Sequence, residues 1–302
     1  MSAVIQITRA GPLTTIQDEG RFGMLRHGIG ASGPMDRQGF AAAGALAGAG
    51  LGGVEFTMAG LEIAVASGHC RLGFAGGHFV AHHNGQAVDW FGSVELKSGD
   101  SFAVTPGAWG NYGYLRFGGD VVAQRMMGSV ATSSRAGLGG LDGRALRAGD
   151  VIDVAGPGRE SATAAPQQRD DGPIRFVWGL HADLFPQMVR QRFIDGAFRV
   201  STQMDRMGVR LTDDGGVFAE ASNRSLVSDA IVAGDIQILG DGTPIVLMRD
   251  HQPTGGYPRI GTVITADLDG FAQLRPGSMV AFEPVTVEHA HTLLRSGQAW
   301  TR

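Results

Sequence analysis

The chain has 302 residues, of which 43% are hydrophobic and 18% charged, and its formal net charge is −4 at neutral pH. This length allows one large domain or two ordinary ones, and the composition is that of a folded globular protein, not a disordered one. The charge gives no reason to expect nucleic acid or an anionic membrane as a partner.

The expected location is the cytoplasm. The longest apolar stretches are short and interrupted by glycine, so none approaches a membrane span. Residues 1–20 lack the basic start and apolar core of a secretory leader. The single cysteine, Cys70, excludes an intramolecular disulfide and fits a reducing compartment.

Short β-like runs dominate the chain and recur at the spacing typical of sandwiches and barrels. The 48 glycines fit this pattern, because tight turns between short strands favour glycine. The predicted strands are Val54–Met58, Leu61–Val65, Arg71–Ala75, Ser101–Thr105, Tyr112–Phe117, Val151–Val154, Ile174–Trp178, Gln237–Leu239, Ile245–Met248, Thr262–Thr265 and Met279–Phe282.

Helical patterns are few. Asp36 is placed to cap a helix over Arg37–Ala47, whose Ala/Gly-rich sequence predicts close packing on a neighbour. Asp183 is expected to cap a second helix with Pro186 in its first turn. A third helix covers about Val287–Arg295. The fold class is therefore mainly β with a few short helices.

A polar segment rich in Pro, Gly, Ala and Ser divides the chain. We place the linker at residues 159–172, with an N-terminal domain over 1–158 and a C-terminal domain over 173–302. Met35-Asp36-Arg37 in the first part returns as Met204-Asp205-Arg206 in the second, which suggests two related domains. Independent reuse of short turn motifs explains the echo as well.

Several kinds of chemistry are excluded by the sequence. Lys97 is the only lysine and follows Leu96, so the chain has no P-loop and offers no suitable lysine for covalent biotin. There is no G-x-S-x-G elbow. The cluster of His78, His82 and His83 has no carboxylate at metal-binding spacing, and we expect no metal site. Gly28–Gly33 matches G-x-G-x-x-G but lacks a preceding strand, so we interpret it as a glycine turn.

The segment Asp250–Arg259 is the main candidate site. It follows an apolar strand and carries acid, imidazole, amide, hydroxyl and guanidinium groups within ten residues. Gly255 and Gly256 would let backbone amides converge on an anion. Such a loop at the end of a rigid strand suits a small carboxylate or amide, although an ordinary polar hairpin remains the alternative.

Other acid–arginine sets are weaker candidates. Asp205, Arg206 and Arg210 would form either a buried ion pair that braces a turn or a clamp for a substrate carboxylate. Asp36, beyond the Asp18–Arg21 segment, and Arg135, in a small-residue loop, are candidates of the same kind in the first half.

Six segments stand in order along the chain: Gly11–Arg21, Ser32–Asp36, Ser134–Gly140, Arg144–Asp150, Asp205–Gly208 and Thr254–Pro258. Together they resemble the signatures of the allophanate hydrolase subunit 2 family, also called the KipA family, which includes the C-type subunit of 5-oxoprolinase. Similar domains form part of the carboxyltransferase region of urea carboxylase. The resemblance implies two tandem cyclophilin-like β-barrel domains.

The resemblance also implies a subunit of an amide-hydrolysing complex, active with a KipI-like B-type subunit and with an A-type subunit that uses ATP. The expected reaction opens the lactam of 5-oxoproline to glutamate, and the isolated chain is expected to be inactive. No cofactor is expected to be bound covalently by this chain. One alternative is carboxyl transfer to a urea-like acceptor, with biotin on a separate carrier. Another is a regulatory protein that binds a KipI-like inhibitor.

Site roles follow from this hypothesis. The expected catalytic residues are Asp250 or His251 as the acid/base group and Arg259 as a stabiliser of developing negative charge. The remaining candidates are expected to bind substrate: Thr254, Gly255, Gly256, Tyr257, Arg206, Arg210, Asp205, Asp36 and Arg135.

Three departures from the family pattern concern the substrate more than the fold. Ala75–His78 stands where an acid is usual, and Pro253 replaces a threonine. The segment Leu115–Asp120, which includes Arg116, is more charged than the common apolar version.

Overall fold

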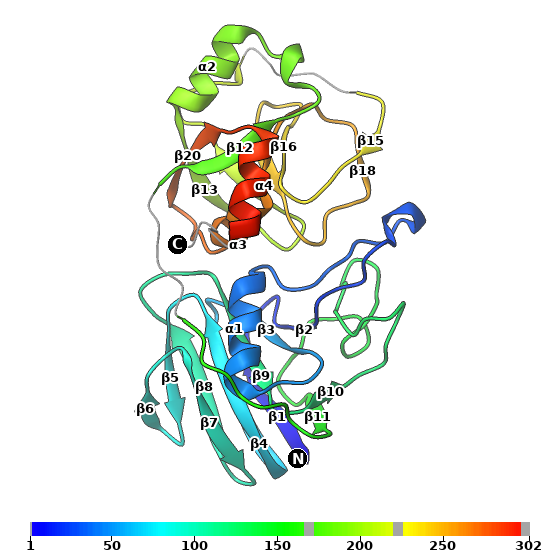
Figure 1. The fold of residues 1–302 in the computed structure, drawn as a ribbon, viewed down its shortest axis with the longest axis vertical. Coiled ribbons are helices and arrows are strands. Elements are labelled where there is room, and N and C mark those ends of the chain that lie inside the picture. The colour runs from blue at the N-terminus through cyan, green and yellow to red at the C-terminus, as the bar shows by residue number, and fades with distance from the viewer. Residues whose placement is uncertain (1, 166–171, 220–225, 297–302) are drawn as a thin grey trace. The chain divides into compact units, whose positions relative to one another are not determined.

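The computed structural model describes residues 2–165, 172–219 and 226–296, and the chain forms two compact units (Figure 1). The first comprises Met1–Gly23 and Ala31–Gln167, and the second comprises Met24–Gly30 and Gln168–Arg302. The short segment Met24–Gly30 thus lies with the second unit, although both of its neighbours in the sequence belong to the first. Part of the predicted linker, residues 166–171, lies outside the described residues.

Eleven strands of the first unit form one open sheet. They are β1 (Ser2–Ala10), β2 (Thr15–Gln17), β3 (Gly53–Thr57), β4 (Leu61–Gly76), β5 (Phe79–His83), β6 (Gln86–Val88), β7 (Gly92–Lys97), β8 (Ser101–Pro106), β9 (Tyr112–Phe117), β10 (Asp120–Val122) and β11 (Val151–Ala155). The central strand is β4, which pairs antiparallel with β1, β7, β8 and β9. Two predicted strands, Leu61–Val65 and Arg71–Ala75, are therefore two ends of one strand of 16 residues.

Helix α1 (Arg37–Ala47) packs on β4 and β9 and begins as predicted. The Asp36 side chain caps it by accepting a hydrogen bond from the Gly39 amide at 2.8 Å. The predicted close packing is confirmed at Gly73 in β4, where a Cβ atom would lie 2.2 Å from the carbonyl oxygen of Ala43. Glycine at this point lets the helix backbone approach the sheet.

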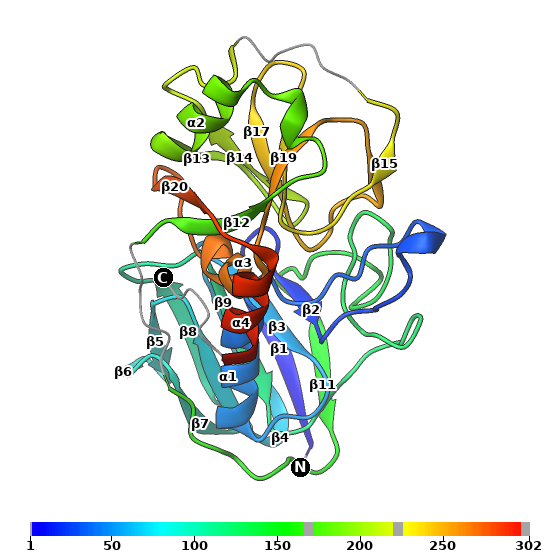
Figure 2. The same ribbon diagram turned by 45° about the horizontal axis from the view of Figure 1, so that its top comes forward.

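The second unit is built on a closed barrel in the order β12-β19-β16-β17-β14-β13-β20 (Figure 2). Its strands are β12 (Ile174–Trp178), β13 (Ala197–Met204), β14 (Gly208–Thr212), β16 (Asp235–Ile238), β17 (Pro244–Leu247), β19 (Arg259–Val263) and β20 (Met279–Pro284). A separate two-stranded ladder joins β15 (Asp229–Ala230) to β18 (Thr254–Gly255). Closure removes the exposed edges that an open sheet would leave.

The barrel core is aromatic. Phe176, Phe193 and Phe282 meet at ring-centroid distances of 5.0 to 6.2 Å, and Phe198 and Phe218 extend the cluster. Aromatic rings bury large apolar areas, so this cluster supplies much of the hydrophobic stabilisation of the unit.

The remaining helices confirm one prediction and correct two. Helix α4 (Val287–Ser296) matches the predicted third helix. Helix α2 (Gln187–Asp195) begins after Pro186 without a side-chain cap, so the prediction that Asp183 caps it is wrong. Asp183 lies instead in the short 3₁₀ helix η2 (Ala182–Leu184). Helix α3 (Thr265–Ala272) was not predicted, because every residue of it except Thr265 is buried and its apolar positions show little helical periodicity.

The prediction of a mainly β fold with a few short helices is confirmed, with a closed seven-stranded barrel in the second unit and an open eleven-stranded sheet in the first. No helix in the described part of the chain is long and apolar enough to cross a membrane.

Candidate functional site

The predicted site segment lies in the second unit, between two strands of the barrel. It begins after β17 and the two residues Met248 and Arg249, passes through β18 and ends at the first residue of β19. Because both flanking strands belong to the closed barrel, the loop is anchored at each end on a rigid support. Gly30, from the segment Met24–Gly30, also lies against this loop: a Cβ atom there would be 3.5 Å from the carbonyl oxygen of His251.

Asp250 is held by Arg206. The Arg206 Nε–H donates to Asp250 Oδ2 at 2.8 Å, and Nη2 donates to Oδ1 at 3.2 Å. The Asp250 amide also donates to the Arg206 carbonyl oxygen at 2.7 Å. Both carboxylate oxygens are therefore engaged. Arg206 therefore forms a buried ion pair with Asp250, which holds Asp250 in place beside His251.

His251 is buried, and its geometry specifies the tautomer. Its Nδ1 lies 2.6 Å from the Gln252 carbonyl oxygen, which can only accept, so Nδ1 carries the proton. Burial lowers the pKa of His251 below its ordinary value, opposed in part by the hydrogen bond to Gln252 and by the charges of Asp235 and Asp250. A neutral imidazole in this tautomer offers the Nε2 lone pair as a proton acceptor.

Arg259 is the centre of a second charged network. Its Nη2 donates to Asp229 at 2.6 Å, and its Nη1 donates to the Ala230 carbonyl at 2.7 Å. Its Nη1 is also 3.5 Å from Asp235 Oδ2. The hydroxyl of Thr262 donates to the other oxygen of Asp235 at 2.6 Å. Arg259 therefore joins β19 to β16 and to the short β15–β18 ladder.

The glycines of the segment do not form the expected anion-binding curl. Thr254 and Gly255 lie in β18 and pair with Ala230 and Asp229, and neither Gly255 nor Gly256 has a positive φ angle. Close approach, not a curl, explains Gly255: a Cβ atom there would lie 2.6 Å from Gln237 Nε2. Tyr257 is exposed on the same loop.

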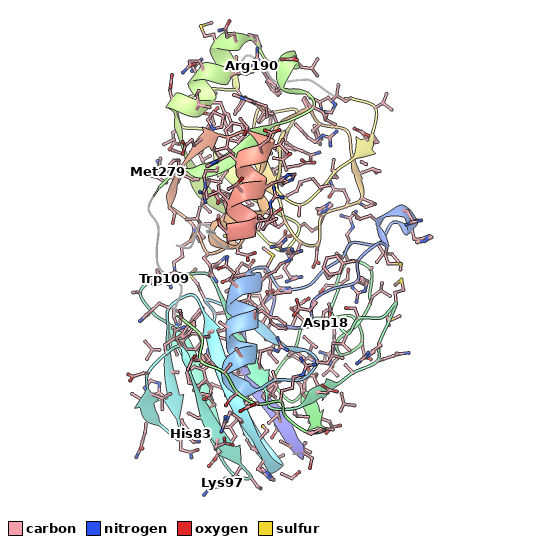
Figure 3. All side chains as sticks on the ribbon, in the orientation of Figure 1. Asp18, His83, Lys97, Trp109, Arg190 and Met279 are labelled. Atoms are coloured by element: carbon pink, nitrogen blue, oxygen red, sulfur yellow. The ribbon has the colours of Figure 1, made fainter. Side chains whose placement is uncertain are left out.

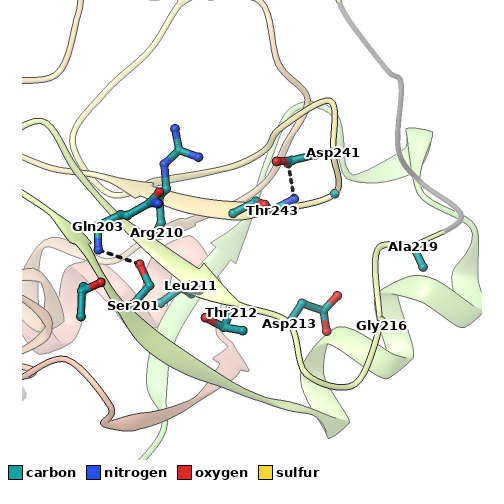
Figure 4. A pocket seen from close by; sticks show the side chains of 12 residues that line it. Ser201, Gln203, Arg210, Leu211, Thr212, Asp213, Gly216, Ala219, Asp241 and Thr243 are labelled. Carbon is teal, nitrogen blue, oxygen red and sulfur yellow. Dashed lines mark hydrogen bonds between the residues drawn. The ribbon is translucent and has the colours of Figure 1, made fainter.

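Asp205 lies in the turn between β13 and β14, and Arg210 lies in β14. Asp205 Oδ1 accepts hydrogen bonds from the amides of Met207 and Gly208, which identifies it as a turn brace. Arg210 lines a polar groove of about 510 Å³ with Asp241, Thr243 and other hydroxyl-bearing residues (Figure 4).

Asp36 and Arg135 belong to the first unit. Asp36 is fully buried, and its amide donates to the Tyr114 hydroxyl at 2.7 Å. That hydroxyl donates in turn to Glu55 at 3.0 Å, and burial raises the pKa of Tyr114. Asp36 thus has a structural role at the start of α1. Arg135 lies in an exposed loop between Ser133 and Leu138.

Three residues near the loop were missed by the sequence analysis. Asp235 supports Arg259, and His181 accepts a hydrogen bond from the Arg259 amide at 3.3 Å. Gln237 is 1% exposed, and its Nε2 has no hydrogen-bond partner in the described part of the chain. A polar residue within the predicted strand Gln237–Leu239 was the only available signal for Gln237. Among the described residues, no three His, Cys, Asp or Glu side chains gather as metal ligands.

Comparison with known proteins places these features in a family. Residues 27–284 match the carboxyltransferase domain family, subdomain A and B. The chain is 32% identical over 292 residues to the C-type subunit of 5-oxoprolinase from Escherichia coli K12, covering 95% of this chain and 93% of that protein. It is 30% identical over 301 residues to the corresponding 5-oxoprolinase subunit of Haemophilus influenzae, with coverages of 98% and 96%.

A solved structure extends the similarity to a larger enzyme. The crystal structure of the Kluyveromyces lactis urea amidolyase superimposes with a TM-score of 0.87 at 25% identity, covering 98% of this chain. This chain spans 19% of that protein's length. The sequence match, the near-complete coverage of two relatives and the shared fold agree, and the chain belongs to the carboxyltransferase domain family, subdomain A and B.

Proposed function

We propose that this chain is the C-type subunit of an ATP-dependent 5-oxoprolinase-type complex, which hydrolyses the lactam of 5-oxoproline to glutamate together with its A-type and B-type partners. The observation that carries the proposal is coverage: the similarity extends over 93% and 96% of two such 5-oxoprolinase subunits. The urea amidolyase match covers 19% of a much longer chain. Correspondence with a whole subunit supports the same division of labour here.

His251 is the proposed acid/base group of the reaction. Its neutral imidazole can take a proton at Nε2 from the attacking water while the hydroxide adds to the lactam carbonyl carbon. The same nitrogen can then give that proton to the ring nitrogen as the C–N bond breaks, so the proton count balances. Asp250 and Arg206 hold the adjacent backbone, which keeps the imidazole in place.

The proposed substrate contacts come from the same loop. Thr254, Gly255, Gly256 and Tyr257 would contact the substrate carboxylate. Arg259, held by the carboxylates of Asp229 and Asp235, would offset the negative charge that develops on the carbonyl oxygen.

The remaining parts of the proposal concern the complex. ATP is used through the A-type subunit, the direct partner is a KipI-like B-type subunit, and the isolated chain is inactive. No cofactor is bound covalently by this chain.

A second candidate function is carboxyl transfer to urea or a related acceptor, with biotin on a separate carrier. The specific observation in its favour is the structural similarity to urea amidolyase over 98% of this chain. In that reaction the loop around His251 would handle the proton of the acceptor amide. A third candidate is regulation of a KipI-like protein by binding alone.

Reconstitution tests the proposal. The chain would be co-expressed with its KipI-like partner and with the ATP-using partner, and 5-oxoproline-dependent release of ADP and glutamate would be measured. The expected result is activity that disappears when this chain is omitted. The matched control is the complete mixture carrying His251→Gln, which retains the assembly but lacks the proton acceptor.

The outcomes separate the three candidates. A well-formed complex without 5-oxoproline turnover would overturn the oxoprolinase proposal. Turnover of urea with a biotinylated carrier and bicarbonate would then support carboxyl transfer. Tight binding of the KipI-like protein with neither activity would support regulation.

A further inference from the structure

A cavity lined by side chains of both charges lies entirely within the first unit. It shares no residue with the loop around His251, so a ligand bound there would be additional to the proposed function of that loop. Its volume is about 280 Å³, and its charged lining residues are Asp18, Glu19, Asp120, Arg116, Arg125 and Arg159. Asp18 is marked in Figure 3. The three arginines are the feature to explain, because like charges repel unless a counter-charge lies between them.

Arg116 is the buried member of the set. It is 7% exposed and lies in β9, with its guanidinium carbon 3.9 Å from the centroid of the Phe40 ring. It donates to the carbonyl oxygens of Gly50 at 2.7 Å and Phe40 at 3.4 Å. No described carboxylate lies within ion-pair distance of it, and its Nε has no hydrogen-bond partner among the described residues. A buried guanidinium without a carboxylate partner is costly.

The surrounding backbone is shaped to admit this side chain. A Cβ atom on Gly53 would lie 2.3 Å from Arg116 Cδ, and one on Gly44 would lie 3.1 Å from Nη1. Two glycines on different elements, β3 and α1, thus leave the space that the arginine occupies. Such clearance lets this long side chain lie directly against the backbone of both elements.

The other arginines are placed by the backbone around the end of α1. The Arg159 amide donates to the carbonyl oxygen of Gly48, the C-cap of α1, at 2.7 Å. Arg159 and Arg125 are exposed, and neither forms an ion pair with a described carboxylate. Burial lowers the pKa of Arg116 to about 10, the charge of Glu19 opposes that shift, and the charge of Arg159 adds to it. The positive charge of Arg159 therefore acts on Arg116 within this cavity.

The acidic residues that line the cavity determine what else a ligand must offer besides negative charge. Asp18 is already satisfied by the Ser129 hydroxyl and the Val130 amide, at 2.6 and 2.8 Å. Asp120 accepts a hydrogen bond from the Leu51 amide with Oδ1 at 2.6 Å. Its second oxygen and the carboxylate of Glu19 are therefore the acidic groups that a ligand would contact. A ligand that pairs with the arginines and also offers an ammonium group would satisfy both signs of charge.

We propose that this cavity binds an acidic α-amino acid, with its carboxylates on Arg116, Arg125 and Arg159 and its ammonium group toward Glu19 and Asp120. A volume of about 280 Å³ is sufficient for a molecule of the size of glutamate. The site uses no residue of the Asp250–Arg259 loop, so its presence does not depend on the reaction proposed for that loop.

Binding to the purified full chain tests the site. L-Glutamate would be titrated by calorimetry, with glutarate, which has both carboxylates but no ammonium group, as the matched ligand. Glutamate is expected to bind and glutarate to bind more weakly. Arg116→Met and Arg125→Gln are expected to weaken glutamate binding about tenfold or more, since each removes a charge-assisted contact. Arg147→Gln, an exposed arginine of the same unit outside the cavity, is the control.

Neutralising the carboxylate of Glu19 provides a second readout. Glu19→Gln is expected to weaken glutamate binding and to strengthen glutarate binding, because it removes the ammonium partner and a repulsive carboxylate together. Absence of glutamate binding to the folded chain would overturn the proposal, as would unchanged binding in Arg125→Gln. Arg125 is exposed, so this second variant stays informative if Arg116→Met does not fold. Equal affinity for glutarate and glutamate would overturn the ammonium assignment.

Discussion

Arg206 and Asp250 form a two-point ion pair whose side chains are 5% and 8% exposed. The pair joins the turn before β14 to the residue that precedes His251. The pair therefore anchors the start of the loop, and both of its charges are shielded from solvent.

Removing one partner of this pair is expected to be costly. Asp250→Ala removes the carboxylate that accepts two hydrogen bonds from the buried Arg206 guanidinium, which should lower the free energy of unfolding by about 3–5 kcal/mol. The double variant Arg206→Met/Asp250→Leu removes both charges and should recover most of that loss. Urea denaturation of the three proteins measures the difference. A double variant no more stable than Asp250→Ala would show that charge pairing is not the reason.

His251 is expected to control turnover without controlling stability at neutral pH. His251→Gln keeps a polar side chain of similar length but cannot accept and return a proton. We expect 5-oxoproline turnover of the reconstituted complex to fall by about 10²–10⁴-fold. The KM for 5-oxoproline should change much less than kcat. Wild-type turnover in this variant, with the complex intact, would remove His251 from the mechanism.

The buried imidazole also predicts a pH dependence of stability. Because burial lowers the pKa of His251 in the folded chain, the unfolded chain takes up a proton first as the pH falls through about 6.5. Protonation then favours unfolding, so the contribution of His251 to stability is full above that pH and declines below it. When the pH is lowered from about 7.5 to about 5.5, the free energy of unfolding should fall more for wild type than for His251→Gln. Parallel losses in both proteins would contradict this assignment.

Arg259 has two carboxylate partners of very different exposure. Asp235 is 2% exposed, whereas the Asp229 side chain is 56% exposed. Asp229→Asn should therefore cost less than about 1 kcal/mol, because the exposed carboxylate is already solvated and Arg259 keeps Asp235. Arg259→Met leaves Asp235 buried without its cation and should cost about 3–5 kcal/mol. Equal losses from the two variants, measured by thermal or urea unfolding, would show that burial does not govern the network.

The single cysteine should be unreactive in the native chain. Cys70 is fully buried in β4, and burial raises the pKa of its thiol to about 11. Since the thiolate is the reactive form, labelling by a thiol reagent should be slow in buffer and fast in denaturant. Rapid stoichiometric labelling without loss of structure would contradict the burial of this residue.

Local sequence determined much of the fold. Strands Tyr112–Phe117 and Ile174–Trp178 and helix Arg37–Ala47 have the predicted bounds, because alternation, β-branched or aromatic content and an Asp cap are all local signals. The loop Asp250–Arg259 was proposed as the candidate site from sequence, since a dense set of polar groups following an apolar strand is a local pattern.

What only the tertiary structure decided is which of those polar groups are engaged. The pairing of Asp250 with Arg206 spans 44 positions of the chain, and that of Arg259 with Asp229 spans 30. The cavity around Arg116 collects residues from Asp18 to Arg159. The sequence does not show which partner a charged side chain will have or how deeply it will be buried. Those two properties decide its contribution to stability and its reactivity. The sequence thus determined the family, most of the elements and the candidate loop, while long-range packing decided which charged groups of that loop are engaged in ion pairs and left the imidazole of His251 outside them.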